Sequence, residues 1–205
     1  PVERKERIKE IISQSATAVS GKVLEDDDLL DNITYLVEYP TVIVGRFEQW
    51  FLNLPSEVLI SSMREHQKYF SIVDDADRLL PYFIAVNNTL AKDPELVVRG
   101  NERVLKARLS DAKFFFEEVQ KIHFSDRVHH LKEVVFQSEL GTFYEKVMRF
   151  QKMAEYLALE IKPELKETTK KAALLCKADL TSGMVGEFPK LQGVMGREYA
   201  LLSGE

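Results

Sequence analysis

Apolar and polar residues alternate with a helical period from Gly100 to Glu118, the longest strongly patterned stretch of the chain. Spacings of three and four residues place its apolar side chains on one broad helix face. They are Leu105, Leu109, Ala112 and Phe116, with Val104 and Phe115 at the margins. Arg108 and Asp111 project from within that face, where a charged group must be paired to be buried. The pattern therefore predicts a structural ion pair between Arg108 and Asp111 at a helix contact, with direct substrate contact as the alternative.

The same period predicts two helices near the start of the chain. Residues 2–19 read as a surface helix that stops before Gly21, and residues 29–37 read as an amphipathic helix. The three aspartates at positions 26–28 precede the second helix, at the end where the helix dipole favours acids. We interpret them as capping residues, with a metal site as the alternative.

Two more helices are predicted towards the C-terminal end. One runs from Thr142 to Ile161, because Thr142 and Glu145 have the spacing of a capping box. Residues 165–180 are small or apolar on almost every side. We expect them to form the central, most enclosed helix of their domain, with Asp179 on its apolar side.

Four segments are rich in β-branched and aromatic residues and predict strands. They are residues 41–47, 58–62, 69–73 and 82–86. Gly45, inside the first segment, is a candidate β-bulge position.

The composition of the chain changes near residues 92–96, where β-branched runs give way to long helical periods. We therefore predict an α+β protein with two parts. Residues 1–94 form a mixed and incomplete α/β part, and residues 95–205 form an all-helical domain. Because the chain opens on Pro1, we expect it to be a piece of a longer protein.

Charge and cysteine content narrow the classes of function. The net charge is −5, so any nucleic-acid contact must come from a local basic patch rather than from the field of the whole molecule. Cys176 is the one cysteine, which excludes an intrachain disulfide and favours a reducing compartment. No apolar run is long enough to span a bilayer. We expect a cytoplasmic protein without membrane contact.

Three groups of basic residues are candidates for contact with RNA or with an acidic partner. The first lies on the side of the Gly100 helix away from its apolar face, the second follows within one short connection, and the third belongs to the segment MREHQKYF. They are, in that order, Arg103, Lys106 and Lys113; Lys121, Arg127, His130 and Lys132; and Arg64, His66 and Lys68. The first two groups could form one continuous patch, and a solvated surface is the alternative for all three.

The sequence contains no self-sufficient catalytic site. The glycine-rich phosphate motifs, the HExxH, paired CxxC and GxSxG motifs are absent, and residues 193–196 form only a GxxG. His129 and His130 are adjacent and point to different helix faces, so they do not form a metal-binding pair. Cys176 lies in the predicted enclosed helix, where a small apolar role is expected. We predict neither catalytic residues nor metal ligands in this chain.

Five uncommon segments occur in a fixed order over about residues 27–205. They are MREHQKYF, GNERVLKARLSDAKFFFEE, VVFQSELGTFYEK, CKADLTSGMVGEFPKLQGVMGREYA and SGE. Together they resemble the β subunit of bacterial heterotetrameric glycyl-tRNA synthetase. The resemblance implies an α2β2 enzyme whose α subunit forms the adenylate with ATP and Mg²⁺, while the β subunit binds and positions tRNA(Gly). It also implies that this chain is an internal part of the β subunit, without a cofactor of its own and with tRNA(Gly) and the α subunit as partners.

The same resemblance implies a B3/B4-like domain in the first part and an HD-like helical domain in the second. Active HD phosphohydrolases place adjacent His and Asp on the central helix, whereas this chain has Ala178 and Asp179 there and no His in residues 143–161 or 165–180. A metal site of that type cannot be assembled, so we expect Asp179 to be held by hydroxyl, amide or basic groups. The alternative function is a metal-dependent phosphohydrolase or an editing-type hydrolase of divergent HD or B3/B4-like type.

Overall fold

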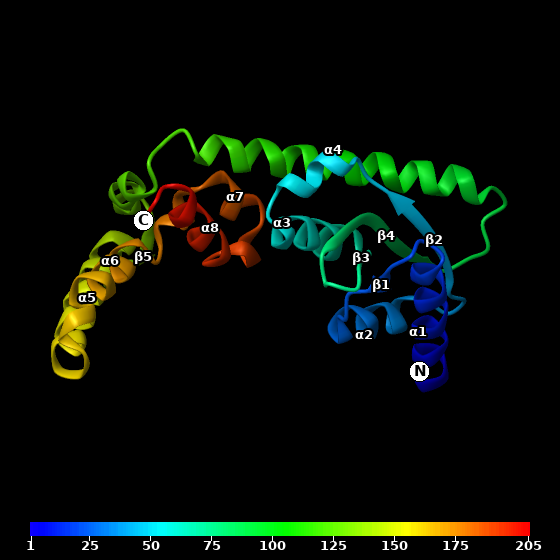
Figure 1. Ribbon diagram of the computed structural model, residues 1–205, viewed down its shortest axis with the longest axis horizontal. Coiled ribbons are helices and arrows are strands. Elements are labelled where there is room, and N and C mark those ends of the chain that lie inside the picture. The colour runs from blue at the N-terminus through cyan, green and yellow to red at the C-terminus, as the bar shows by residue number, and fades with distance from the viewer. The chain divides into compact units, whose positions relative to one another are not determined.

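The computed structural model describes residues 1–205, and these form two compact units, Pro1–Lys113 and Phe114–Glu205 (Figure 1). The boundary lies inside the long helix α4 (Pro94–Val119), and each unit is described by itself. Helices and antiparallel sheets are both present, which confirms the α+β class at this coarse level.

The predicted division at residues 94 and 95 coincides with the start of α4, not with the end of the first unit. The first unit also contains the N-terminal part of α4, in which Leu105, Leu109 and Ala112 are fully buried. The composition of the sequence shows where strands give way to a helix. The unit to which that helix belongs depends instead on the residues among which it is buried.

The first unit alternates helices with the strands of one sheet. Its elements are α1 (Val2–Thr17), β1 (Lys22–Val23), α2 (Asp27–Leu36), β2 (Thr41–Arg46), the 3-10 helix η1 (Gln49–Asn53), α3 (Ser56–Ser61), the π-helix η2 (Ser62–Gln67), β3 (Phe70–Val73), β4 (Leu79–Asn87) and the first part of α4. The sheet order is β1-β3-β4-β2, and every neighbouring pair is antiparallel.

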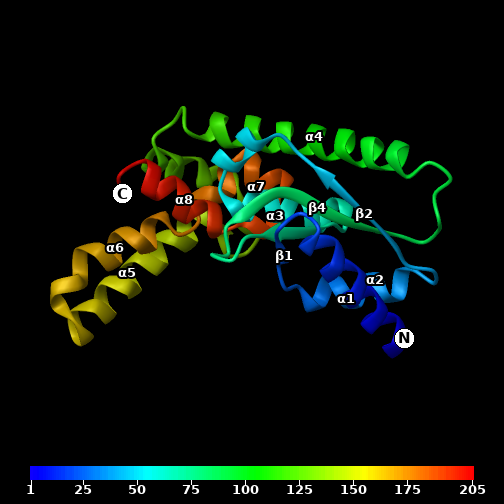
Figure 2. The ribbon, with the colours of Figure 1, turned by 45° about the vertical axis from the view of Figure 1, so that its right-hand side comes forward.

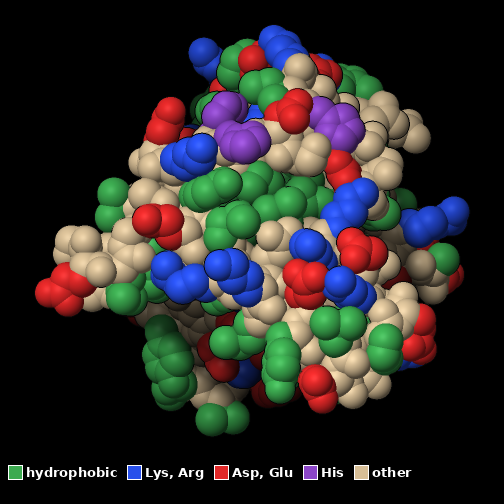
Figure 3. Space-filling view, turned by 90° about the vertical axis from the view of Figure 1, so that its left-hand side faces the viewer, with side chains coloured by type: hydrophobic (Ala, Val, Ile, Leu, Met, Phe, Trp, Pro, Cys, Tyr) green, Lys and Arg blue, Asp and Glu red, His purple; other side chains and the backbone are tan.

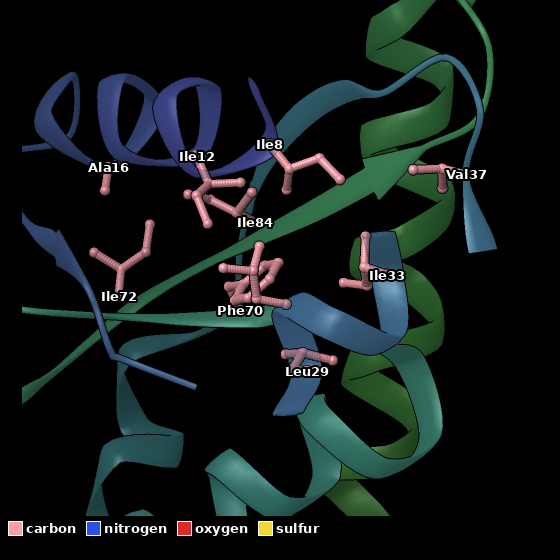
Figure 4. Packing of buried hydrophobic residues seen from close by; sticks show 10 residues of the cluster. Ile8, Ile12, Ala16, Leu29, Ile33, Val37, Phe70, Ile72 and Ile84 are labelled. Carbon is pink, nitrogen blue, oxygen red and sulfur yellow. The ribbon is translucent and has the colours of Figure 1, made fainter. Parts of the chain in front are cut away.

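Helices α1 and α2 cover one face of this sheet (Figure 2). Strand residues that alternate along β3 and β4, Phe70, Ile72 and Ile84, point into a core with Ile8 and Ile12 of α1 (Figure 4). All five side chains are at most 4% exposed. Their burial removes apolar surface from water at about 25 cal/mol per Å², and this holds the two helices on the sheet.

The opposite face of the sheet is built around Phe83, which is fully buried on β4. Its ring stacks on Tyr69 with centroids 4.5 Å apart. Gly45 lies opposite Phe83 in a regular β2–β4 register, and a Cβ at Gly45 would overlap the Phe83 ring. The predicted bulge at Gly45 is therefore wrong: this glycine makes room for an aromatic ring.

Most predicted elements of the first unit are present, but the strand predicted at residues 58–62 is wrong. That segment belongs to α3 and continues into η2. Val58, Leu59, Ser62 and Met63 are fully buried, a spacing that fits one face of a helix and not the alternation of a strand. The Asp26 prediction is confirmed, because its side chain accepts the Leu29 N–H at 2.9 Å.

The second unit contains helices and one small hairpin, so the prediction of an all-helical domain is wrong in this detail. Its elements after α4 are η3 (Phe124–Glu133), β5 (Val135–Gln137), β6 (Gly141–Thr142), α5 (Phe143–Ile161), η4 (Pro163–Leu165), α6 (Lys166–Leu175), η5 (Ala178–Thr181), α7 (Gly183–Glu187), η6 (Pro189–Leu191) and α8 (Val194–Leu202). The capping box of Thr142 and Glu145 is confirmed in both of its hydrogen bonds. Together β5 and β6 form a short antiparallel pair ahead of this cap.

The predicted enclosed helix at residues 165–180 is wrong. Helix α6 packs against α5, but Leu175 is its one buried residue, and Cys176 is exposed. The core of this unit instead surrounds Tyr199 of α8. The centroid of its ring lies 5.8 Å from that of Phe116 and 6.2 Å from that of Phe124. Small and apolar composition does not say whether another element covers a helix.

The apolar face predicted on α4 is present but narrower than its sequence indicates. Leu105, Leu109 and Ala112 are fully buried, Phe116 is half-buried and Val104 is 45% exposed.

The ion pair between Arg108 and Asp111 stays a prediction. The Arg108 side chain is half-buried and Asp111 is exposed.

Asp179 lies on η5, fully buried, and its carboxylate caps the N-terminal end of α8. The N–H groups of Gly193 and Gly196 donate to Oδ2 at 2.5 and 3.2 Å, as predicted for amide partners. The other oxygen, Oδ1, has no hydrogen-bond partner. Burial raises the pKa of this carboxyl, and the two N–H groups offset only part of that effect.

We expect Gly45→Ala to lower the free energy of unfolding by about 1–3 kcal/mol, because the new methyl group must displace the buried Phe83 ring. Urea denaturation would measure the loss. The control is Gly186→Ala, where nothing lies within 4 Å of the added Cβ. Equal stability of the two variants would contradict the overlap.

The free energy of unfolding of Asp179→Asn, compared with that of wild type, should increase as pH rises. A raised carboxyl pKa gives stability that is present below the usual Asp pKa and is lost as pH rises through the folded-state value. Denaturation at pH 4 and pH 7 would show this trend, and Asp126→Asn is an exposed carboxylate control. Asp179→Ala should cost about 1–3 kcal/mol, since it leaves buried N–H groups unpaired. A pH-independent difference between Asp179→Asn and wild type would refute the burial effect.

Candidate nucleic-acid interface

Basic side chains form a stripe along α4 in the first unit. Arg99, Arg103, Lys106 and Lys113 follow one another at spacings of four, three and seven residues, which place them on one side of a helix. The first three are exposed, and Lys113 is half-buried. This stripe contains all three members of the first predicted basic group and adds Arg99.

The segment from Arg46 to Trp50 runs beside this stripe, and we call the space between them the α4 groove. The Arg46 N–H donates to a Glu102 carboxylate oxygen at 2.9 Å, and Lys106 forms an ion pair with Glu48. Farther along, the Lys113 amine lies 6.0 Å from the centroid of the Trp50 ring. These contacts show that this segment runs along α4 from Glu102 to Lys113, about 16 Å at 1.5 Å per residue. The groove is hollowed between Arg46 and Lys106.

The α4 groove opens into a hollow of about 560 Å³. Its lining residues are Arg46, Phe47, Glu48, Arg99, Glu102, Arg103 and Lys106, so basic groups outnumber acidic ones by four to two. Glu102 is occupied by the Arg46 N–H, and the hydrogen bond from Lys106 lowers the pKa of Glu48. The Arg46 and Arg103 side chains have no ion pair, and Arg99 has only an exposed one, at 3.5 Å to Glu95. The hollow therefore offers guanidinium groups to an anion.

Trp50 marks the far end of the groove. Its ring stacks on the buried ring of Phe51 with centroids 3.7 Å apart, and its own side chain is 45% exposed. Phe51 anchors η1, so an aromatic surface is held next to the basic stripe.

Tyr69 fastens α4 to the sheet at the start of the groove. Its hydroxyl donates to the side-chain oxygen of Asn101 at 2.5 Å, and the Asn101 amide donates to the Val97 carbonyl at 2.9 Å. Burial raises the pKa of Tyr69 to about 12, so the hydroxyl keeps its proton as a donor at neutral pH. This bond fixes the position of the basic stripe relative to Arg46.

The second predicted basic group does not form a basic surface as a whole. Arg127 is 6% exposed, and its guanidinium donates to the carbonyl oxygens of Val119 at 3.0 Å and Thr181 at 3.4 Å. Its inclusion among the RNA-binding candidates is therefore corrected, because it ties η3 to neighbouring segments instead.

The remaining members of that group are at the surface. Lys121 pairs with Glu118, Lys132 lies 4.9 Å from the centroid of the Tyr144 ring, and His130 is exposed. On the face shown in Figure 3, lysines and arginines are separated by acidic and apolar side chains.

The third group lies on η2 and at the residue that follows it, and its Arg64 and Lys68 side chains already have partners within the protein. Arg64 pairs with Asp26 at 2.7 Å and contacts Asp28 at 3.5 Å. Lys68 has a left-handed backbone conformation and donates to the Glu65 carbonyl at 3.2 Å, while His66 is exposed. RNA contact by this group stays a prediction.

The sequence reasoning missed Arg46, Arg99 and Trp50. Arg99 precedes Arg103 by four residues, so its place on the stripe could have been found from helical spacing. Arg46 and Trp50 are single residues in a strand and a 3-10 helix, and no periodic signal connects either with α4.

The chain brings no three His, Cys, Asp or Glu side chains into an arrangement that could hold a metal ion. Among its helices, none combines the length and the apolar character needed to cross a membrane.

Comparison with known proteins identifies the family. The sequence profile described as "Glycyl-tRNA synthetase beta subunit" matches residues 1–205. Glycine–tRNA ligase beta subunits of Syntrophus aciditrophicus and Geobacter sulfurreducens are each 60% identical over 205 residues, and that of Geotalea uraniireducens is 58% identical over 204. These alignments cover 100% of this chain and 30% of each relative, so the chain spans about a third of their length. The chain therefore belongs to the glycyl-tRNA synthetase β-subunit family.

Proposed function

We propose that this chain is part of a glycyl-tRNA synthetase β subunit and binds tRNA(Gly) for aminoacylation in the active site of an α subunit. The observation that carries the proposal is the α4 groove, in which Arg46 and Arg103 are exposed and have no ion pair. Guanidinium groups bind phosphate through two parallel hydrogen bonds, and phosphate contacts supply much of the affinity of a protein for nucleic acid. ATP and Mg²⁺ belong to the α subunit in this proposal.

The contribution of the chain to the reaction is positioning. A bound and correctly oriented substrate reacts as if its concentration were very high, so residues far from the reacting atoms can raise the rate. Arg46 and Arg103 would hold the tRNA backbone on a rigid surface, because α4 is fixed to the sheet by Tyr69 and Asn101. No residue of this chain is assigned a chemical step.

The finer fold assignments are part of the same proposal. The first unit would be a B3/B4-like domain, and its four-stranded antiparallel sheet with helices supports this. The second unit would be an HD-like scaffold used for binding, and the use of Asp179 as a helix cap supports that role. A cytoplasmic location follows from the proposed function.

The hydrolase alternative is not favoured. The related proteins reported above are all named as ligase subunits. Asp179, the residue that an HD-type site would need, is directed at the N–H groups of α8.

The proposal is tested by Arg46→Gln with Arg103→Gln in the complete enzyme. Loss of two phosphate contacts should raise the KM for tRNA and lower the slope of log affinity against log salt concentration by about one to two units. Glycyl-adenylate formation should not change. Kinetics at several salt concentrations would measure both effects.

Lys9→Gln with Lys152→Gln is the matched control, because it removes the same charge from exposed lysines that have no ion pair. If both double variants change the salt slope equally, the α4 groove has no specific role in binding RNA.

A further inference from the structure

We infer that the α4 groove binds an unpaired segment of RNA, with phosphates at Arg46 and Arg103 and one base stacked on Trp50. This inference rests on the proposed function and names the kind of RNA structure that the groove accepts. Nothing in the proposed function itself requires single-stranded RNA.

An exposed aromatic ring, that of Trp50, lies beside Lys113 at the end of the basic stripe. Trp50 is 45% exposed, and one side of its ring is supported by Phe51. Arg46, the last residue of β2, lies four residues before Trp50, which is on η1. A backbone that follows the groove from Arg46 therefore brings its bases to Trp50.

A base inside an RNA duplex cannot stack on the Trp50 ring. In helical RNA the base faces are covered by their neighbours, and proteins contact mainly phosphates and 2′-hydroxyls. Unpaired bases expose their faces, and proteins that bind single strands combine aromatic stacking with a basic groove. The α4 groove combines an exposed aromatic ring with basic side chains. A duplex would leave this ring without a base to stack on it.

The charged side chains that line the hollow favour a polyanion. Of the two carboxylates in the hollow, Glu48 is paired with Lys106, and Glu102 accepts the Arg46 N–H. Glu102 keeps its negative charge, but the hollow still has four basic groups against two acidic ones, and neither Arg46 nor Arg103 forms an ion pair. RNA presents a continuous row of phosphates to such guanidinium groups, each of which can accept paired hydrogen bonds, so this lining is suited to a polyanion.

The experiment compares Trp50→Leu, Trp50→Tyr and wild type in the complete enzyme. The probes are a 12-nucleotide single-stranded RNA, a blunt 12-base-pair RNA duplex and a tRNA(Gly) transcript. Trp50→Leu should weaken binding of the single strand about 5- to 100-fold, since one base loses its stacking partner. Trp50→Tyr should restore most of the affinity, because tyrosine also stacks. Binding of the duplex should not change.

Tyr35→Leu is the matched control, because Tyr35 is another exposed aromatic residue of the first unit, 74% exposed. Its replacement should leave all three affinities unchanged. The slope of log affinity against log salt concentration distinguishes the stacking site from the phosphate sites. Trp50→Leu should leave this slope unchanged, whereas Arg46→Gln with Arg103→Gln should lower it.

Two outcomes would overturn the inference. In one, Trp50→Leu binds the single strand like wild type while the arginine variant still weakens tRNA binding, so the proposed function stands and the stacking site fails. In the other, Trp50→Leu leaves RNA binding unchanged but releases the α subunit during purification, which makes Trp50 part of a protein interface. If the arginine variant also behaves like its lysine control, the proposed function fails separately.

Discussion

The position of α4 on the sheet of the first unit is the constraint on which the candidate interface depends. Leu105 and Leu109 are fully buried on one side of α4, and their burial sets roughly which side of the helix faces inward. The hydrogen bond between Tyr69 and Asn101 adds direction at one end. With the helix fixed in this way, the exposed side chain of Arg103 lines the same hollow as Arg46.

The sequence predicted correctly those features that depend on residues close together in the chain. The capping box of Thr142 and Glu145 and the Asp26 cap depend on residues three positions apart, and both are present. The basic stripe on α4 also followed from spacing. Such features need no knowledge of distant segments, because the hydrogen bonds lie within one turn.

The predictions that were wrong depend on contacts between residues far apart in the sequence. Residues 165–180 looked enclosed because they are small and apolar, yet α6 packs mainly against α5 and has Leu175 as its one buried residue. Arg127 looked like a surface cation, yet carbonyl groups 8 and 54 positions away receive its hydrogen bonds. Trp50 meets Lys113 only after the chain has folded. The candidate site was therefore predictable only in part. The basic side of α4 could be found from the sequence, but the segment from Arg46 to Trp50 on the other side of the groove could not.

The carboxylate of Glu102 has another effect that follows from where it lies. Strand β2 is at the edge of its sheet, and an edge strand presents backbone groups that a strand from another molecule can pair with. Glu102 occupies the Arg46 N–H at the end of this edge, and its negative charge would repel the carbonyl oxygen of an incoming strand. A residue in the proposed RNA groove thus also keeps one N–H group of this edge strand from pairing with another strand.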